Sequence, residues 1–235
     1  MKNVRKPEGK KGEEVLERMN KNHTPVSLWA LSHLNIEDNA HVLDIGCGGG
    51  INLERLHKLS PNGKTVGIDY SSTSVKKSID FNKDYVEEGK ISVIEANVQN
   101  IPLEDNSIDI ATAFETVYFW PDIVNSFREV RRVLKDDGLF MIVLTTNGDK
   151  DNLYEDLKKQ VELEVYDDEE LFSLLKDAGF IELTAFIKVH DTKKEHIRSF
   201  VDGSFNEIII DDNFVDDVDD GHHMAPEWLC VVAKK

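Results

Sequence analysis

The stretch HVLDIGCGGG at residues 41–50 decides the fold of this 235-residue chain. Its first six residues are mostly apolar and β-branched, as in a buried strand, and the helix-like run INLERLHKL follows the glycines. Gly46 allows a sharp turn with positive φ, Gly48 allows a ligand to approach the main chain, and Gly50 allows the helix to pack close to the strand. The stretch therefore predicts a strand, a glycine bend and a helix, with a ligand site at the bend.

Strand-like runs alternate with helical patterns along the rest of the chain. Further strands are predicted at 64–70, 91–96, 108–114, 138–145, 180–189 and 227–233. Helices are predicted at about 12–22, 25–34, 71–89, 123–137 and 168–178. In the helix after residue 122, Asp122 is the expected N-cap and Gly138 the expected stop. This alternation is typical of parallel strands joined by helices, so the sequence predicts an α/β fold.

A carboxylate follows the second predicted strand. Asp69 stands in GIDY, 19 residues after Gly50. At that strand end a carboxylate can accept hydrogen bonds from both hydroxyls of a ribose, and Tyr70 offers an aromatic face to a purine. The glycine bend and the carboxylate together predict adenosine binding. The dinucleotide fingerprint G-x-G-x-x-G would need glycine at position 51, where this chain has Ile51, so a nicotinamide- or flavin-dependent oxidoreductase is disfavoured.

The composition restricts the partners. Forty-five acidic residues stand against 28 basic ones, a formal charge of −17, which argues against nucleic acid or an anionic membrane surface and permits cationic or neutral small molecules. No apolar run approaches the ~20 residues of a membrane span, and no secretory signal is expected. Cys47 and Cys230 make no disulfide framework and no zinc spacing. These features predict a cytoplasmic protein without membrane insertion.

Three blocks of sequence carry a family resemblance. VLDIGCGGG, then GIDYS, then NIPLEDNSIDIATAFETVYFWPD followed by FREVRRVLKDDG, resemble the class I S-adenosylmethionine-dependent methyltransferases. Within that family the chain is similar to the small-molecule branch typified by ubiquinone- and menaquinone-biosynthesis methyltransferases. The resemblance implies a Rossmann-like sheet of seven mostly parallel strands in the order 3-2-1-4-5-7-6. Its last strand is antiparallel, and helices cover both faces.

The same resemblance implies one methyltransferase domain over residues 1–235. Its expected parts are an N-terminal helical lid at 1–39, a Rossmann-like core at 40–189, an acidic insertion or loop at 190–226 and a final strand at 227–235. The acidic segment is expected to be a solvated connection between the last two strands.

The implied cofactor is S-adenosyl-L-methionine, with S-adenosyl-L-homocysteine as the product. The implied cofactor-binding residues are Asp44, Gly46, Cys47, Gly48, Gly50, Asp69, Tyr70, Asn97, Val98, Phe114 and Glu115. The glycine loop would run along the methionine part, Asp44 would hold the loop and the ammonium group, and Asp69 would take the ribose diol. Asn97 stands where the family usually has Asp to receive the adenine amino group, and the Val98 N–H would meet a ring nitrogen.

The acceptor side is less defined by the resemblance. The expected substrate-binding residues are Tyr118, Phe119, Trp120, His23 and Trp29. The aromatic run follows a strand end and could hold an apolar or cationic acceptor. The segment MNKNHTPVSLWAL resembles a lid helix of some relatives, which also places Asn20 over the cofactor or substrate. Relatives often carry histidine near the position of Tyr118, and this chain has none there. For an acceptor that must be deprotonated, the candidate catalytic residues are His23, Glu115 and Tyr118.

The predicted function is methyl transfer to a small-molecule acceptor by in-line displacement, in which positioning can contribute ~7–11 kcal/mol of the barrier. One alternative is a non-catalytic S-adenosylmethionine-binding sensor or partner subunit, for which Asn97 leaves room. A less favoured alternative is a nicotinamide-dependent oxidoreductase. The sequence predicts no metal site. Residues 216–227 follow an EF-hand spacing only in part, because position three is Val218, and adjacent His222 and His223 would point apart in a strand.

Overall fold

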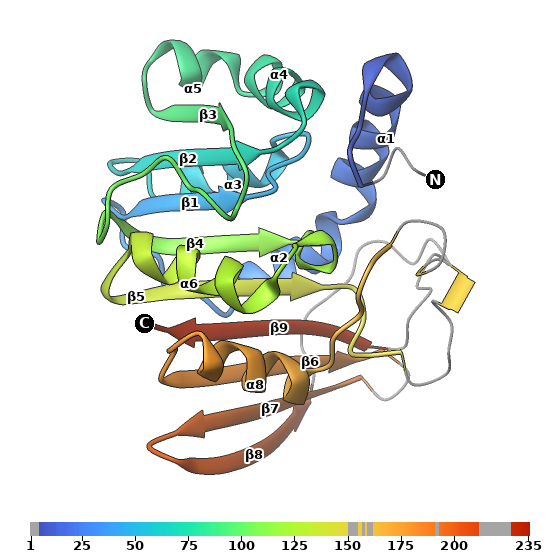
Figure 1. The fold of residues 1–235 in the computed structure, drawn as a ribbon, viewed down its shortest axis with the longest axis vertical. Helices are drawn as coiled ribbons and strands as arrows, with labels where there is room; N and C mark the ends of the chain where they lie inside the picture. Colours follow the sequence, from blue (N-terminus) through green and yellow to red (C-terminus); the bar gives the residue numbers. More distant parts are fainter. Residues whose placement is uncertain (1–4, 150–154, 157, 159–161, 191–192, 212–226) are drawn as a thin grey trace.

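The computed structural model describes residues 5–149, 155–156, 158, 162–190, 193–211 and 227–235 (Figure 1). Within these ranges nine strands form one mixed sheet in the order β3-β2-β1-β4-β5-β9-β6-β7-β8. The strands are β1 His41–Ile45, β2 Lys64–Asp69, β3 Ile91–Glu95, β4 Ile108–Phe114, β5 Leu134–Leu144, β6 Glu182–Val189, β7 Lys194–Val201, β8 Ser204–Asp211 and β9 Glu227–Lys234. Strands β1 to β5 pair in parallel, whereas β9 pairs antiparallel with both β5 and β6.

Helices cover both faces of this sheet. They are α1 Gly9–Asn22, α2 Thr24–Leu31, α3 Ile51–Leu59, α4 Ser72–Phe81, α5 Lys83–Glu87, α6 Ile123–Val133 and α8 Asp168–Asp177, with a short 3₁₀ turn, η1, at Val117–Phe119. Figure 1 shows α6 and α8 in front of the strands and α2 and α3 behind them. None of the helices in the described ranges has the length and apolar character of a membrane span.

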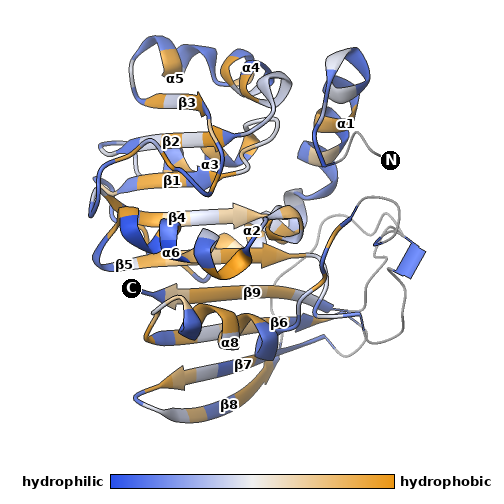
Figure 2. Ribbon diagram, in the orientation of Figure 1, coloured by the Kyte–Doolittle hydropathy of each residue, from blue (hydrophilic) through white to orange (hydrophobic). Residues whose placement is uncertain are grey.

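The central strands are apolar on both faces because each face packs against helices. Figure 2 shows β5 and β9 as hydrophobic strands in the middle of the sheet. Along β5, Phe140 and Ile142 belong to the core cluster that contains α6 and α8. The alternate residues Met141 and Val143 belong to the cluster that contains α2. All four side chains are fully buried, as expected for a strand with both faces covered.

The predicted strand order is confirmed, with β9 in the place of the seventh strand, and two further strands extend the β6 edge. The expectation of a loop throughout 190–226 is therefore wrong for β7 and β8, which form an antiparallel hairpin. Its turn is Asp202-Gly203, both with positive φ of 50° and 77°. Asp-Gly is a preferred two-residue hairpin turn, a signal that the acidic composition of the segment obscured. Residues 212–226, with the partial EF-hand spacing and the histidine pair, lie outside the described residues.

Several element boundaries differ from the predictions. The helix expected to reach residue 89 is broken at Asn82, whose buried side-chain amide donates to the carbonyls of Gly50 and Ser78 at 2.9 and 3.0 Å. Helix α6 ends at Val133 and β5 starts at once, so Gly138 lies inside a strand and not at a helix end. Asp122 precedes α6 with a φ of 43° and makes no side-chain cap. Pairing of β5 with β4 begins at Leu134, so strand pairing and not a glycine stop sets the end of α6.

Gly50 is required for packing, and its substitution can be tested against a matched glycine. Gly50 and Gly89 both have positive φ, of 84° and 71°. A Cβ at Gly50 would lie 2.5 Å from Ser78 Oγ and 2.9 Å from Ser78 Cα, whereas a Cβ at Gly89 meets nothing within 4 Å. Both Gly→Ala changes carry backbone strain of about 1–2 kcal/mol, and only Gly50→Ala adds overpacking of about 1–3 kcal/mol.

We therefore expect Gly50→Ala to lower the free energy of unfolding by more than Gly89→Ala, by that overpacking difference. Urea unfolding of the two variants and the wild type measures it. Equal losses would contradict the close packing of α4 on Gly50.

Candidate active site

A cavity of about 230 Å³ lies where β1, β2 and β4 end. Its walls come from the ends of these strands, from the start of α3 and from the N-terminal segment that includes α1. The carboxyl ends of parallel strands are where an open α/β sheet binds its ligands, at the point where the strand order reverses. Here β1 pairs with β2 on one side and with β4 on the other, so the cavity lies at that reversal point.

The glycine bend forms the floor of this cavity. The N–H groups of Gly46 and Cys47 both donate to the carbonyl of Ile68, at 2.7 and 3.1 Å, which fixes the bend against β2. Gly46 and Gly48 have φ values of 76° and 52°. A Cβ on Gly46 would lie 2.3 Å from the hydroxyl oxygen of Thr116, so only glycine fits there. The backbone between β1 and α3 is thereby exposed to a ligand.

Asp69 connects the end of β2 to the bend. One carboxylate oxygen accepts from the Gly48 N–H at 3.1 Å and the other from the Ser71 N–H at 2.8 Å. Burial raises the pKa of Asp69, and these two backbone hydrogen bonds oppose the rise. Asp69 lines the cavity, and a carboxylate has more acceptor sites than these two N–H groups occupy.

Asp44 is the second buried carboxylate, on β1. It is 2 % exposed, and its Oδ1 accepts from the Thr112 hydroxyl on β4 at 2.8 Å. Burial raises the pKa of Asp44 to about 7, and the nearby charge of Asp69 adds to the rise. In the described part of the chain, neither aspartate forms an ion pair with a lysine, arginine or histidine. The cavity thus holds two acids that a cationic ligand would stabilise.

Glu115 lies at the end of β4 with a positive φ of 56°. Its carboxylate accepts from the N–H and hydroxyl of Thr145 and, at 3.4 Å, from the hydroxyl of Tyr118. Burial raises the pKa of Glu115, and the charge of His23 opposes the rise. The strained backbone and these donors hold one carboxylate in a fixed place on the cavity wall.

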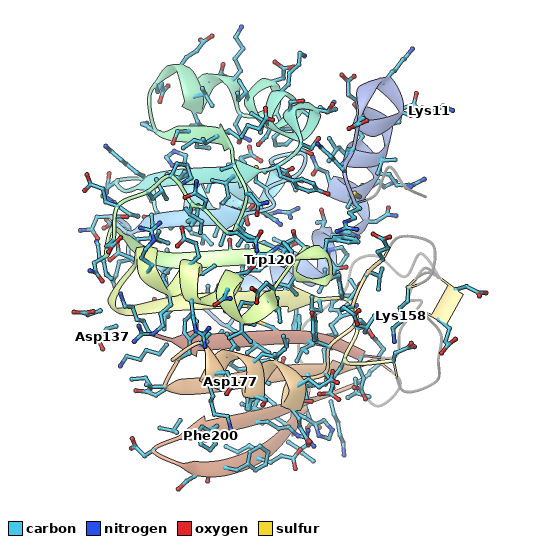
Figure 3. The ribbon with its side chains drawn as sticks, viewed as in Figure 1. Lys11, Trp120, Asp137, Lys158, Asp177 and Phe200 are labelled. Carbon is cyan, nitrogen blue, oxygen red and sulfur yellow. The ribbon has the colours of Figure 1, made fainter. Side chains whose placement is uncertain are left out.

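The N-terminal segment covers the cavity. Residues of this segment that line it are Arg5, Pro7, Leu16, Met19, Asn20 and His23. Ser71 Oγ donates to the Pro7 carbonyl at 2.5 Å, and Asn20 Nδ2 donates to the Gly49 carbonyl at 3.2 Å. The Tyr70 hydroxyl donates to the backbone carbonyl of Arg5. Figure 1 shows α1 beyond the ends of β1 and β2, and in Figure 3 Lys11 of α1 extends away from the sheet.

Most of the expected site residues line this one cavity. They are Asp44, Gly46, Cys47, Gly48, Asp69, Tyr70, Asn97, Val98, Phe114, Glu115, His23, Phe119 and Trp120. Asn97 is held in a turn, since its Oδ1 accepts from the Gln99 N–H at 3.0 Å and its backbone carbonyl accepts from the Asn100 N–H. Burial raises the pKa of the Cys47 thiol, which suits a small loop residue and not a nucleophile.

Three expected site residues do not line the cavity. Gly50 instead makes room for α4. Tyr118 packs against the core, and its hydroxyl donates to the Glu115 carboxylate at 3.4 Å. Trp29 is 1 % exposed, and its indole N–H donates to Glu195 of β7 at 2.8 Å. The expectation that Trp29 covers cofactor or substrate is not met, because Trp29 packs against the sheet in the cluster that contains Met141 and Val143.

The structure adds lining residues that the sequence did not single out. They include Ser27 of α2, Asn52 and Arg55 of α3, and Thr116 after β4. Asn52 and Arg55 lie within the first turns after the glycine bend, and this position is the signal that could have found them. Arg55 donates to Asn52 Oδ1 at 2.7 Å and to Thr24 Oγ1 at 2.6 Å.

Known methyltransferases are similar to this chain in sequence. Residues 43–142 match the methyltransferase domain family. The putative methyltransferase YrhH of Bacillus subtilis (strain 168) is 30 % identical over 130 residues, which cover 55 % of this chain and 71 % of that protein. The sterol 4-C-methyltransferase strm-1 of Caenorhabditis elegans is 30 % identical over 153 residues, 62 % of this chain and 42 % of that protein. The chain thus spans less than half the length of that second relative.

Solved structures show the same fold. A structure of the complex between the Haloferax volcanii Trm112 methyltransferase activator and a putative methyltransferase matches with a TM-score of 0.71, at 19 % identity over 94 % of each chain. Geranyl diphosphate methyltransferase in complex with S-adenosylmethionine matches with a TM-score of 0.69, at 13 % identity over 98 % of this chain and 93 % of that one. With the glycine bend and the two strand-end carboxylates in place, the chain belongs to the class I S-adenosylmethionine-dependent methyltransferases.

Proposed function

We propose that this protein transfers the methyl group of S-adenosylmethionine to a small-molecule acceptor. One observation carries the proposal: the glycine bend and two buried carboxylates without cationic partners meet in a single cavity. Asp69 is fixed by the Gly48 and Ser71 N–H groups and has lone pairs left for a ribose diol. Asp44 lies buried beside it and would be stabilised by the ammonium group of the methionine part.

The residues present fit this cofactor. Tyr70 and Val98 line the side of the cavity next to Asp69, where an adenine ring would need an aromatic face and a backbone donor. Asn97 lies there too, and its Oδ1 has a second lone pair besides the one that the Gln99 N–H occupies. The Gly46–Gly48 backbone offers the methionine part a surface without side chains. The adenosine and amino-acid parts thus have separate sets of partners.

The chemistry follows from positioning. S-adenosylmethionine supplies a methyl carbon that its positive sulfur already activates toward a nucleophile. The chain's residues hold the cofactor in the bend and orient the acceptor against Phe119 and Trp120, which line the same cavity. Such alignment can contribute ~7–11 kcal/mol without a dedicated base. Where the acceptor must lose a proton, Glu115 takes it, because its raised pKa brings a carboxylate closer to the basicity of a general base.

The relatives support a small acceptor. Their names include a sterol 4-C-methyltransferase, a 2-phytyl-1,4-naphtoquinone methyltransferase of Trichormus variabilis and a geranyl diphosphate methyltransferase. All three act on small molecules, and the quinone enzyme is 34 % identical over 97 residues, 41 % of this chain.

The role of Asp69 in cofactor binding can be measured directly. We expect Asp69→Asn to weaken S-adenosylhomocysteine binding at least tenfold in isothermal titration calorimetry, because a charge-assisted hydrogen bond is worth roughly 1.5–3 kcal/mol. Glu95→Gln is the matched control: Glu95 lies opposite Asp69 on β3 and is exposed. If the two variants bind alike, or the wild type does not bind, the proposed cofactor site is wrong.

The raised pKa of Asp44 predicts that cofactor binding depends on pH. With a pKa of about 7, its carboxyl is half protonated in the free protein near neutral pH. The ligand's ammonium group favours the ionised form, so binding releases a proton and strengthens as pH rises. We expect the affinity for S-adenosylhomocysteine to fall about tenfold between pH 8 and pH 6, with proton release visible in buffers of different ionisation enthalpy. Asp44→Asn should flatten this profile, and a pH-independent wild type would contradict the assignment.

Catalysis itself is tested with labelled cofactor. We expect transfer of the labelled methyl group to at least one of four acceptor classes, namely amines, thiols, phenols and carbon acids. The Asp69→Asn variant should be slower at subsaturating cofactor, while Glu95→Gln should match the wild type. Binding of S-adenosylhomocysteine without transfer to any class would instead favour a non-catalytic, cofactor-binding protein.

A further inference from the structure

Arg55 is a half-buried arginine on the cavity wall. It lies on α3, one turn after the glycine bend. Its guanidinium donates to two neutral oxygens, Asn52 Oδ1 at 2.7 Å and Thr24 Oγ1 at 2.6 Å. Across the described residues, no carboxylate forms an ion pair with it. A guanidinium has five N–H donors, so three remain for an anion in the cavity.

Ser27 gives an independent indication of a polar binding site. Its side chain is 1 % exposed and lines the same cavity, yet its hydroxyl has no hydrogen-bond partner in the described structure. Ser27 follows Thr24 by three residues on α2, so both side chains lie on one face of that helix. Because Thr24 contacts the Arg55 guanidinium, the Ser27 hydroxyl lies one helical turn along the same face. A buried, unpartnered hydroxyl costs roughly 1–3 kcal/mol unless a ligand satisfies it.

We propose that Arg55 and Ser27 form a carboxylate-binding subsite, which holds the α-carboxylate of the cofactor's methionine part. This inference rests on the proposed function. Asp44 is the proposed partner of the ammonium group of the methionine part. The α-carboxylate of the methionine part needs a cationic partner of its own. Arg55 supplies the planar donor pair that matches a carboxylate.

The location favours the cofactor's carboxylate over that of an acceptor. Arg55 belongs to the helix that starts at the bend, and the bend is the surface proposed for the methionine part. Asn20 donates to the Gly49 carbonyl, and Arg55 donates to the Thr24 hydroxyl. These two hydrogen bonds hold the junction of α1 and α2 against the start of α3. The aromatic residues proposed for the acceptor, Phe119 and Trp120, follow β4 instead. A carboxylate bound at Arg55 would therefore also secure the covering segment.

The test compares two ligands that differ by one group. S-adenosylmethionine and decarboxylated S-adenosylmethionine share the adenosine, the sulfonium and the amine, and only the first has a carboxylate. Calorimetry on the full chain should show wild type binding S-adenosylmethionine at least tenfold more tightly than its decarboxylated form. In Arg55→Gln this ratio should fall below threefold, with the affinity for the decarboxylated ligand changed less than twofold. Ser27→Ala should lower the ratio in the same direction by a smaller factor.

Controls separate this subsite from folding and from the proposed function. Arg18→Gln removes an exposed arginine of α1 and should keep the wild-type ratio. Thermal unfolding checks that each variant is folded, and Arg55→Lys should retain part of the ratio because charge remains without the fork. Equal weakening of both ligands, or no change in Arg55→Gln, would overturn the carboxylate assignment while leaving the cofactor site intact. Failure of the wild type to bind either ligand would instead refute the proposed function.

Discussion

The hydrogen bonds from the Gly48 and Ser71 N–H groups to Asp69 fix the geometry on which the site depends. They tie the loop after β1 to the start of the segment after β2, two places that only parallel pairing brings together. The glycines permit the bend, and the carboxylate holds it in one conformation. Because Asp69 also lines the cavity, one side chain both shapes the loop and presents an acceptor to a ligand in the proposed site.

Burial of Asp69 and Asp44 prepares the cavity for a cationic ligand but lowers the stability of the unligated protein when these carboxyls ionise. A carboxyl with a raised folded-state pKa binds a proton more tightly in the folded chain than in the unfolded one. For Asp44 the unligated protein therefore loses stability as pH rises from about 4 to about 7, because the unfolded state binds fewer protons there. A cationic ligand reverses this effect by stabilising the ionised form. The acids are thus placed for binding and not for the stability of the empty protein.

The sequence predicted the central part of the fold because each of its signals was local and strong. The glycine bend, Asp69 at the end of β2 and the apolar run of β5 each specify a strand or its end without reference to distant residues. The prediction missed features set by tertiary contacts. Helix α4 stops where Asn82 turns to bond Gly50, and Trp29 is buried because α2 packs against the sheet. Arg55 was missed because the sequence does not show that its guanidinium donates to two neutral oxygens and forms no ion pair within the described residues.

The Trp29–Glu195 hydrogen bond joins parts of the chain that the methyltransferase core alone would leave separate. Glu195 belongs to the hairpin that widens the sheet, and it also lies 3.1 Å from the His33 imidazole, just after α2. The added strands thus brace the helix that carries Ser27 and whose N-terminus follows His23. Because the Trp29 side chain is buried, loss of the hairpin would leave its indole N–H without an acceptor. The hairpin thus couples the outer edge of the sheet to the helix that covers the cavity.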